Sequence, residues 1–278
     1  MDQTFLQRLD LDELLRTRAA KYHRWIPRFV IRALERYICQ DRMNQILPNI
    51  GHLHGAEFAK GLLHELDIKY AIEKGEENLL SPDNCRVTYV CNHPLGALDG
   101  VCLIDWVTKR HGIEPAFVVN DLLSVLTPLN DIFVPINKHG AQSRTAVSGV
   151  DAAFADYNRP VIMFPAGLCS RQLKKGAEIC DLKWNKMFIP KSADSGRTII
   201  PVRFVGQNTP QFYRFARRRE RLGLKFNLEM LRLPREMILA EGNRYGLRIG
   251  QVIKPEDLRR GPGAVAQAAE IRNYIYTL

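Results

Sequence analysis

Residues 87–100, VTYVCNHPLGALDG, join a short apolar run to a polar turn and then to a helical pattern. The run at 87–91 has the length and the β-branched content of a buried strand. It stops abruptly at Asn92 and His93, and Asp99 follows within a few positions. In α/β proteins, functional side chains gather where strands end and loops meet. The segment therefore predicts both a fold class and a candidate site.

The same alternation continues along most of the chain from about residue 80. Short β-rich runs are found at 86–91, 116–120, 131–136, 161–164, 198–205 and 246–253. Helical patterns lie between them, at 100–110, 143–157, 208–222 and 227–240. This alternation predicts an α/β fold with a mixed, largely parallel sheet flanked by helices.

We expect a helical N-terminal region at residues 1–79 and a catalytic domain at 80–278. Asp10, with Glu13 three residues later, is a capping arrangement at a helix start. A second predicted helix, at 24–39, has an arginine every fourth residue beside a broad apolar arc. This pattern is typical of a helix lying in a membrane surface. It also fits a helix whose apolar arc packs on the catalytic domain, and both interpretations can hold together.

Composition restricts the class of protein. The chain has 278 residues, of which 46% are hydrophobic, as in a globular protein with a large core. It has neither the basic and apolar pattern of a secretory signal nor a run of about 20 apolar residues. We therefore expect the protein to stay in the cytoplasm. Together with the predicted surface helix at 24–39, this favours a peripheral location on the cytoplasmic face of a membrane. The six cysteines form no CxxC pair, which predicts buried thiols and no metal site.

The formal charge of +10 favours an acidic partner: nucleic acid, anionic lipid or an acidic carrier protein. Much of this charge lies in the run RFARRRERLGLKF at 214–226. Such a run is most often a solvated helix face. A nucleic-acid-binding protein is the alternative, but no recognition motif accompanies the charge.

His93 and Asp99 have the chemistry of a general base and its orienting acid. Histidine titrates near neutral pH and can take a proton from a hydroxyl that attacks a carbonyl. An aspartate on the other ring nitrogen fixes the tautomer and stabilises the imidazolium. The nucleophile would then be the hydroxyl of the substrate. Two alternatives remain: Asp99 merely caps the next helix, or Cys91 or Cys169 acts with His93 in a hydrolase.

Ordered blocks now mark a family resemblance. Asn92, His93 and Asp99, followed by FPAGLCSR at 164–171 and IIPV at 199–202, resemble the glycerolipid and lysophospholipid acyltransferases. The chain looks most like the hemolysin-like bacterial branch, which includes O-acyltransferases of ornithine and glycine lipids. The resemblance implies transfer of a fatty acyl group from an acyl carrier protein or coenzyme A thioester to a lipid hydroxyl. It implies no metal, no prosthetic group and no nucleic acid.

The resemblance also implies roles for particular residues. His93 and Asp99 are the expected catalytic pair, and backbone amides near Gly167 would stabilise the oxyanion. The expected substrate-binding residues are Asn92, Gly96, Lys138, Pro165, Gly167, Ser170 and Arg171.

Two departures from the family pattern refine this expectation. Five residues separate His93 from Asp99, where the family usually has four. Gly96 is the expected place for the extra residue, because glycine tolerates positive φ. The second block lacks the usual Glu and Arg, since Ala166 and Cys169 stand there.

That arginine is associated with the phosphate of a glycerol-phosphate acceptor. Its absence favours a lyso amino acid lipid, such as lyso-ornithine or lyso-glycine lipid, over lysophosphatidic acid. Arg171 or Lys138 would supply the positive charge to the head group. Acylation of 1-acylglycerol-3-phosphate remains the alternative activity.

Overall fold

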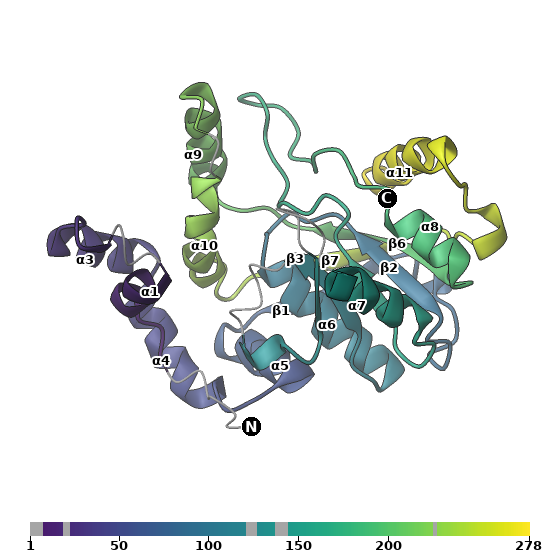
Figure 1. Cartoon of the computed structure of the whole chain (residues 1–278), viewed down its shortest axis with the longest axis horizontal. Coiled ribbons are helices and arrows are strands. Elements are labelled where there is room, and N and C mark those ends of the chain that lie inside the picture. Colours follow the sequence, from purple (N-terminus) through teal and green to yellow (C-terminus); the bar gives the residue numbers. More distant parts are fainter. Residues whose placement is uncertain (1–7, 19–22, 121–126, 137–143, 225–226) are drawn as a thin grey trace.

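The computed structural model describes residues 8–18, 23–120, 127–136, 144–224 and 227–278. Within these ranges the strands form one sheet, in the order β1-β7-β6-β2-β5-β3-β4 (Figure 1). The strands are β1 (Lys69–Lys74), β2 (Val87–Cys91), β3 (Ala116–Asn120), β4 (Phe133–Ile136), β5 (Val161–Met163), β6 (Thr198–Val205) and β7 (Arg244–Ile249).

The sheet is mixed and largely parallel, as the sequence predicts. β2 lies at its centre and pairs in parallel with β5 on one side and β6 on the other. β3 and β4 continue the parallel arrangement. β7 pairs antiparallel with β6 and parallel with β1, so these two strands run opposite to the rest. His93 and Phe164 therefore follow neighbouring parallel strands and leave the same edge of the sheet.

Helices cover both faces of the sheet. The described α-helices are α1 (Leu11–Arg18), α3 (Arg28–Tyr37), α4 (Gln40–Ile50), α5 (Gly55–Glu65), α6 (Leu98–His111), α7 (Arg144–Ala155), α8 (Phe188–Asp194), α9 (Pro210–Arg221), α10 (Leu233–Leu239) and α11 (Pro262–Ile275). Short 3₁₀ helices occur at η1 (Glu76–Asn78), η3 (Thr127–Leu129), η4 (Leu228–Arg232) and η5 (Pro255–Asp257).

Side chains of β2 alternate between two hydrophobic cores, as a strand requires. Tyr89 and Cys91 face the core that α5 and α6 cover. Val90 faces the core that α7, α8 and α11 cover. All five residues of β2 are buried, which explains why its sequence is almost entirely apolar. Its polar residue Thr88 accepts the Ser192 hydroxyl at 3.0 Å.

The N-terminal helices α1, α3 and α4 extend to one side of the sheet (Figure 1). Side-chain contacts tie them to the segment around α10. Arg232 donates to the Tyr37 hydroxyl at 2.9 Å, and Arg42 lies 2.8 Å from Glu241. Glu13 N–H donates to Asp10 Oδ1 at 3.0 Å, so the predicted cap of the first helix is present.

The predicted boundary at residue 79 does not separate two packed units. β1 lies inside the region expected to be helical, yet it is the edge strand beside β7. α5, also before residue 79, contributes to the core beneath the sheet. The sequence KYAIEK was not predicted as a strand because three of its six residues are charged. Charged side chains are common on edge strands, where one edge faces solvent.

Some predicted element boundaries shift for identifiable reasons. The helix expected at 24–39 begins at Arg28, because Pro27 occupies its N-cap. The helix expected at 227–240 is divided into η4 and α10, and Pro234 lies in the first turn of α10. The last strand ends at Ile249 and not at residue 253.

Among the described residues, no helix combines the length and the apolar character needed to cross a membrane.

Candidate active site

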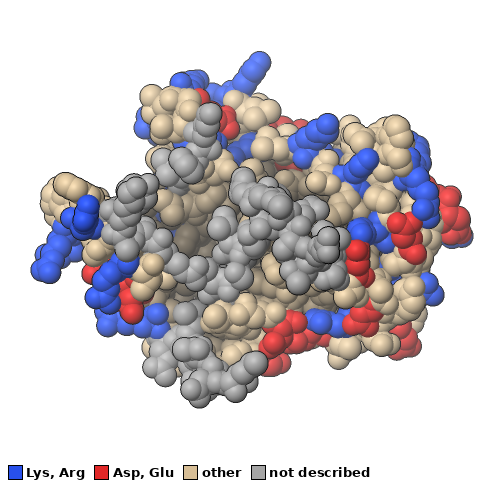
Figure 2. Space-filling model, viewed as in Figure 1, with Lys and Arg blue, Asp and Glu red and all other residues tan. Residues whose placement is uncertain are grey.

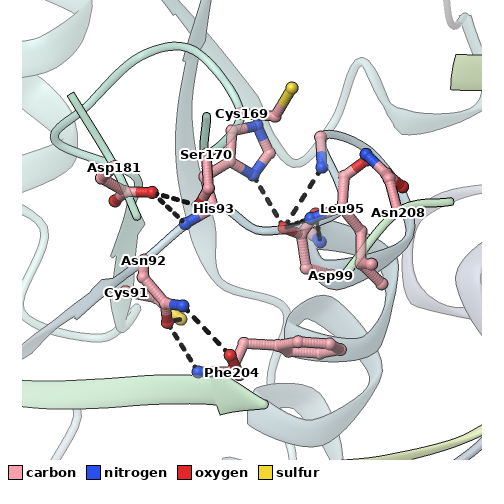
Figure 3. A network of polar contacts seen from close by, with 12 residues as sticks. Cys91, Asn92, His93, Leu95, Asp99, Cys169, Ser170, Asp181, Phe204 and Asn208 are labelled. Atoms are coloured by element: carbon pink, nitrogen blue, oxygen red, sulfur yellow. Dashed lines mark hydrogen bonds and ion pairs between the residues drawn. The ribbon is translucent and has the colours of Figure 1, made fainter. Parts of the chain in front are cut away.

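His93 and Asp99 meet at the carboxyl end of β2. His93 Nδ1 lies 3.0 Å from Asp99 Oδ2, and Asp99 is buried in the first turn of α6 (Figure 3). The same oxygen accepts the backbone N–H groups of Leu95 at 2.9 Å and Gly96 at 3.3 Å. Because this oxygen acts as an acceptor for two backbone N–H groups, we assign the ring proton of His93 to Nδ1, which donates to it. Nε2 is then the nitrogen that can take a proton.

Gly96 makes this short connection possible. It has φ +81°, the positive value expected at the extra residue between His93 and Asp99. A Cβ atom here would lie 2.9 Å from both Cys169 Cβ and Leu233 Cδ2. The turn therefore needs glycine both for its backbone angle and for space.

The imidazole of His93 is held from a second side by Phe164, which follows β5. The two rings stack with centroids 4.0 Å apart and planes 19° from parallel. Phe117 of β3 contacts Phe164 edge-on, with centroids 5.4 Å apart. Three neighbouring strands thus fix the orientation of one ring.

Asp181 is a polar residue of this site that sequence reasoning missed. Its Oδ1 accepts the backbone N–H of His93 at 3.1 Å and the Ser170 hydroxyl at 2.6 Å (Figure 3). Its Oδ2 accepts the Trp184 indole N–H at 2.8 Å. Burial raises the pKa of Asp181. No motif marks this residue, which is 88 positions from its partner His93.

Ser170 N–H also donates to His93 O, at 2.7 Å. The backbone around His93 is therefore bound to the segment after β5 from two directions, and both paths involve Ser170. The two sequence blocks that mark the family resemblance form one continuous network in space.

Comparison with known proteins decides the family. A family model described as Acyltransferase matches residues 13–278. The chain belongs to this acyltransferase family. The resemblance based on the sequence motifs is confirmed, and the protein is an acyltransferase enzyme.

Two curated relatives match this acyltransferase along its whole length. A lyso-glycine lipid O-acyltransferase of Phocaeicola vulgatus is 39% identical over 277 residues, covering 100% of this chain and 96% of the relative. A lyso-glycine lipid O-acyltransferase of Bacteroides thetaiotaomicron is 36% identical, covering 100% and 99%.

A crystal structure supports the fold. The 1-acyl-sn-glycerophosphate (LPA) acyltransferase PlsC of Thermotoga maritima aligns with a TM-score of 0.50 and 15% identity. The alignment covers 80% of this chain and 77% of that one. At this identity the similarity concerns the fold alone.

Three of the residues predicted to bind substrate make hydrogen bonds that hold the backbone near the site. Asn92 bridges to β6: its Oδ1 accepts Phe204 N–H at 2.7 Å, and its Nδ2 donates to Phe204 O at 3.0 Å. Pro165 O accepts Asn185 N–H at 2.9 Å. Gly167 has φ +61°, and its N–H donates to Phe164 O at 3.0 Å. The Gly167 amide expected to stabilise an oxyanion is thus part of a turn.

Arg171 is buried in a charge cluster. Its Nη2 lies 2.7 Å from Glu229 Oε1, and Arg219 contacts the same carboxylate at 3.0 Å. Its Nη1 donates to Cys169 O at 2.8 Å. Arg171 therefore stabilises the segment after β5. We do not assign it a role in binding the head group of the acceptor. Lys138, the other cation predicted for that role, lies outside the described residues.

The two cysteines near the site lack the properties of a nucleophile. Cys91 and Cys169 are both fully buried. Burial raises the pKa of the Cys91 thiol well above its ordinary value and that of Cys169 to about 11. A reactive cysteine needs the opposite shift. The hydrolase alternative therefore has no support in this geometry.

A hollow of about 560 Å³ borders this network. The residues that line it include Asn92, Pro94, Ser170, Arg203 and Phe204. Its volume is within the range of about 300–1,000 Å³ that small-molecule sites occupy. His93 and Asp99 do not line it, but Asn92 and Pro94 flank His93 in the chain, so the hollow is the candidate space for part of a substrate.

Proposed function

We propose that this acyltransferase moves a fatty acyl group from a thioester to the hydroxyl of a lyso amino acid lipid, with lyso-glycine lipid as the favoured acceptor. The observation that carries the proposal is the pair His93 and Asp99, joined at 3.0 Å beside thiols that burial makes unreactive. A base without a protein nucleophile suits direct transfer to a substrate hydroxyl.

In the proposed reaction, His93 Nε2 takes the proton from the acceptor hydroxyl as its oxygen attacks the thioester carbonyl. Asp99 stabilises the imidazolium through Nδ1–H. The tetrahedral intermediate then collapses, the carbon–sulfur bond breaks, and the thiolate takes the proton back from His93. The products are an ester and a free thiol. Every proton and electron pair is accounted for without a metal or prosthetic group.

The choice of acceptor rests on two supports. Relatives of 39% and 36% identity, aligned from end to end, are named lyso-glycine lipid O-acyltransferases. The chain also has Ala166 and Cys169 where phosphate-acceptor enzymes usually have Glu and Arg. Lysophosphatidic acid remains the competing acceptor.

We also propose a peripheral location on the cytoplasmic face of a bacterial membrane, where α3 contacts the lipid. Ile31 of α3 is buried, whereas Trp25, just before the helix, and Phe29 are 74% and 73% exposed. Arginines at 24, 28, 32 and 36 are exposed beside them. This combination supports a helix that packs on the protein with one part and inserts aromatic residues among lipids with another.

The proposed acyl donor is an acyl carrier protein thioester or a coenzyme A thioester.

The test is an acyl-transfer assay with purified protein. Lyso-glycine lipid, lyso-ornithine lipid and lysophosphatidic acid are each supplied with acyl-coenzyme A or with acyl carrier protein thioester, and the products are identified by mass. We expect the amino acid lipids to be acylated well above lysophosphatidic acid. Strong acylation of lysophosphatidic acid alone would overturn the choice of acceptor. An acyl group found on the protein itself would overturn direct transfer.

A further inference from the structure

Two protruding segments near the candidate site expose leucines. Leu173 lies in the loop after β5 and is 58% exposed. Leu222 and Leu224, just beyond α9, are 74% and 45% exposed. Figure 1 shows α9 and this loop rising together above the sheet. We call these two segments, residues 172–178 and 214–224, the leucine rim.

The two segments are joined where they leave the body of the protein. Arg217 of α9 donates to the side-chain oxygen of Gln172 and to its carbonyl oxygen. One residue earlier, Arg171 is anchored on the buried Glu229. Arg219 of α9 contacts the same carboxylate. The leucines are thus presented on a base that ion pairs and hydrogen bonds hold together.

Positive charge surrounds the exposed leucines. Figure 2 shows Lys and Arg side chains over α9 and the neighbouring loop at the top of the molecule. Lys174 and Lys175 follow Leu173, and Arg214, Arg218 and Arg221 are exposed on α9. Arg218 precedes Leu222 by about one helical turn, which is a rise of about 5.4 Å. Arg221 directly precedes Leu222, so exposed cations and the exposed leucine lie together at the end of α9.

We propose that the leucine rim is a second membrane-contact surface, separate from α3. Leu173 and Leu222 insert among the acyl chains of an anionic membrane, while the lysines and arginines contact lipid phosphates. An acidic carrier protein would be attracted by the same charges. The exposed leucines favour the membrane, because lipid chains remove apolar side chains from water while the headgroups contact the cations.

The leucine rim lies next to the hollow proposed to hold part of the substrate. Gln172, Ala177 and Glu178 of the rim also line the hollow that borders Asn92 and Ser170. An acceptor lipid could enter the hollow at this edge while its chain remains in the membrane. This step rests on the proposed function, because it requires a lipid acceptor.

The test compares the double variant Leu173→Ser, Leu222→Ser with Val265→Ser, all of which leave the net charge unchanged. Both leucines are exposed, so the double variant should fold normally, as a melting curve would check. Val265 is 40% exposed on α11, on another part of the molecule, and is the matched control (Figure 1). Binding is measured by sedimentation with vesicles of phosphatidylglycerol and phosphatidylethanolamine.

We expect the double variant to bind these vesicles about tenfold more weakly, and the control within about twofold of the wild type. Equal binding by the double variant and the wild type would overturn the proposal, as would a wild type that does not bind the vesicles. Activity adds a second measurement. The double variant should lose turnover on an acceptor embedded in vesicles and keep it on the same acceptor dispersed in detergent.

These outcomes separate the rim from the proposed function. If the wild type acylates no lyso-lipid in detergent, the proposed function fails, whatever the vesicles show. If the wild type is active and the double variant loses turnover in detergent only with the carrier-protein donor, while its vesicle binding is normal, the rim is a docking surface for carrier protein. The membrane proposal is then wrong.

Discussion

The leucine rim and the loop around His93 lie close together in the structure. They differ in how their side chains are accommodated. Around His93, the carboxylates of Asp99 and Asp181 are buried and accept several hydrogen bonds each. In the rim, Leu173 and Leu222 are largely exposed. Unpaired buried charges and exposed apolar side chains both cost free energy. Around His93, hydrogen bonds within the protein compensate the buried charges. In the rim, the leucines stay in contact with water unless a partner covers them.

The largest effect should come from His93→Ala. We expect turnover to fall by roughly 10²- to 10⁴-fold, the usual contribution of a placed general base. Melting temperature should fall only modestly, because Leu95 and Gly96 N–H still donate to Asp99 and Asp181 still holds the His93 backbone. His52→Ala, at an exposed histidine on another part of the chain, is the control. A folded His93→Ala protein with near-normal turnover would refute the proposed mechanism.

Asp99→Asn removes the negative charge next to the imidazolium. We expect turnover to fall on the order of 10²-fold. Asp105→Asn is the matched control, because Asp105 instead accepts the Tyr70 hydroxyl at 2.5 Å and lies 2.7 Å from Lys109. If Asp105→Asn is the more damaging substitution in a steady-state assay, the histidine has a different partner.

Asp181→Asn tests whether the network behind His93 positions the ring. The amide replaces an acceptor with a donor beside His93 N–H, Ser170 O–H or the Trp184 indole. A small displacement of the ring should lower kcat about tenfold and leave the KM for the donor almost unchanged. Trp184→Phe, which removes one donor only, should keep most of kcat. A normal kcat for Asp181→Asn in a folded protein would limit this residue to a structural role.

The smallest effect concerns α3. Trp25→Ser combined with Phe29→Ser should weaken binding to anionic vesicles about fivefold and leave turnover on a detergent-dispersed acceptor unchanged. Leu14→Ser, at a less exposed leucine of α1, is the control. Vesicle binding equal to that of the wild type would show that the exposed aromatic residues do not face the membrane.

The sequence predicted the central strands and the His93–Asp99 pair well, because both depend on neighbouring residues. A run buried on two faces is mostly apolar, and β2, β3 and β6 were predicted within one residue of their observed bounds. The turn at Gly96 was predicted from the spacing of two residues in one loop. β1 was missed because its pairing with β7 lies far away in sequence and its exposed edge carries charge.

The role of Arg171 is the clearest case that sequence alone could not decide. A guanidinium two residues after Cys169 suggested a ligand for a head group. Its partner, Glu229, is 58 residues away and 2.7 Å distant. Nothing local distinguishes an arginine that awaits a substrate from one that already has a buried carboxylate.

The amino-acid sequence by itself determined the class of the sheet, the contact between His93 and Asp99, and the family, because each is encoded in residues close together along the chain. Only the tertiary structure decided that Asp181 supports the loop of His93, and that Arg171 pairs with the buried Glu229. It also decided that two separate segments form the leucine rim. The physical reason is the same in each case. Hydrogen bonds and ion pairs act over about 3 Å of space, whatever the distance along the chain between their partners.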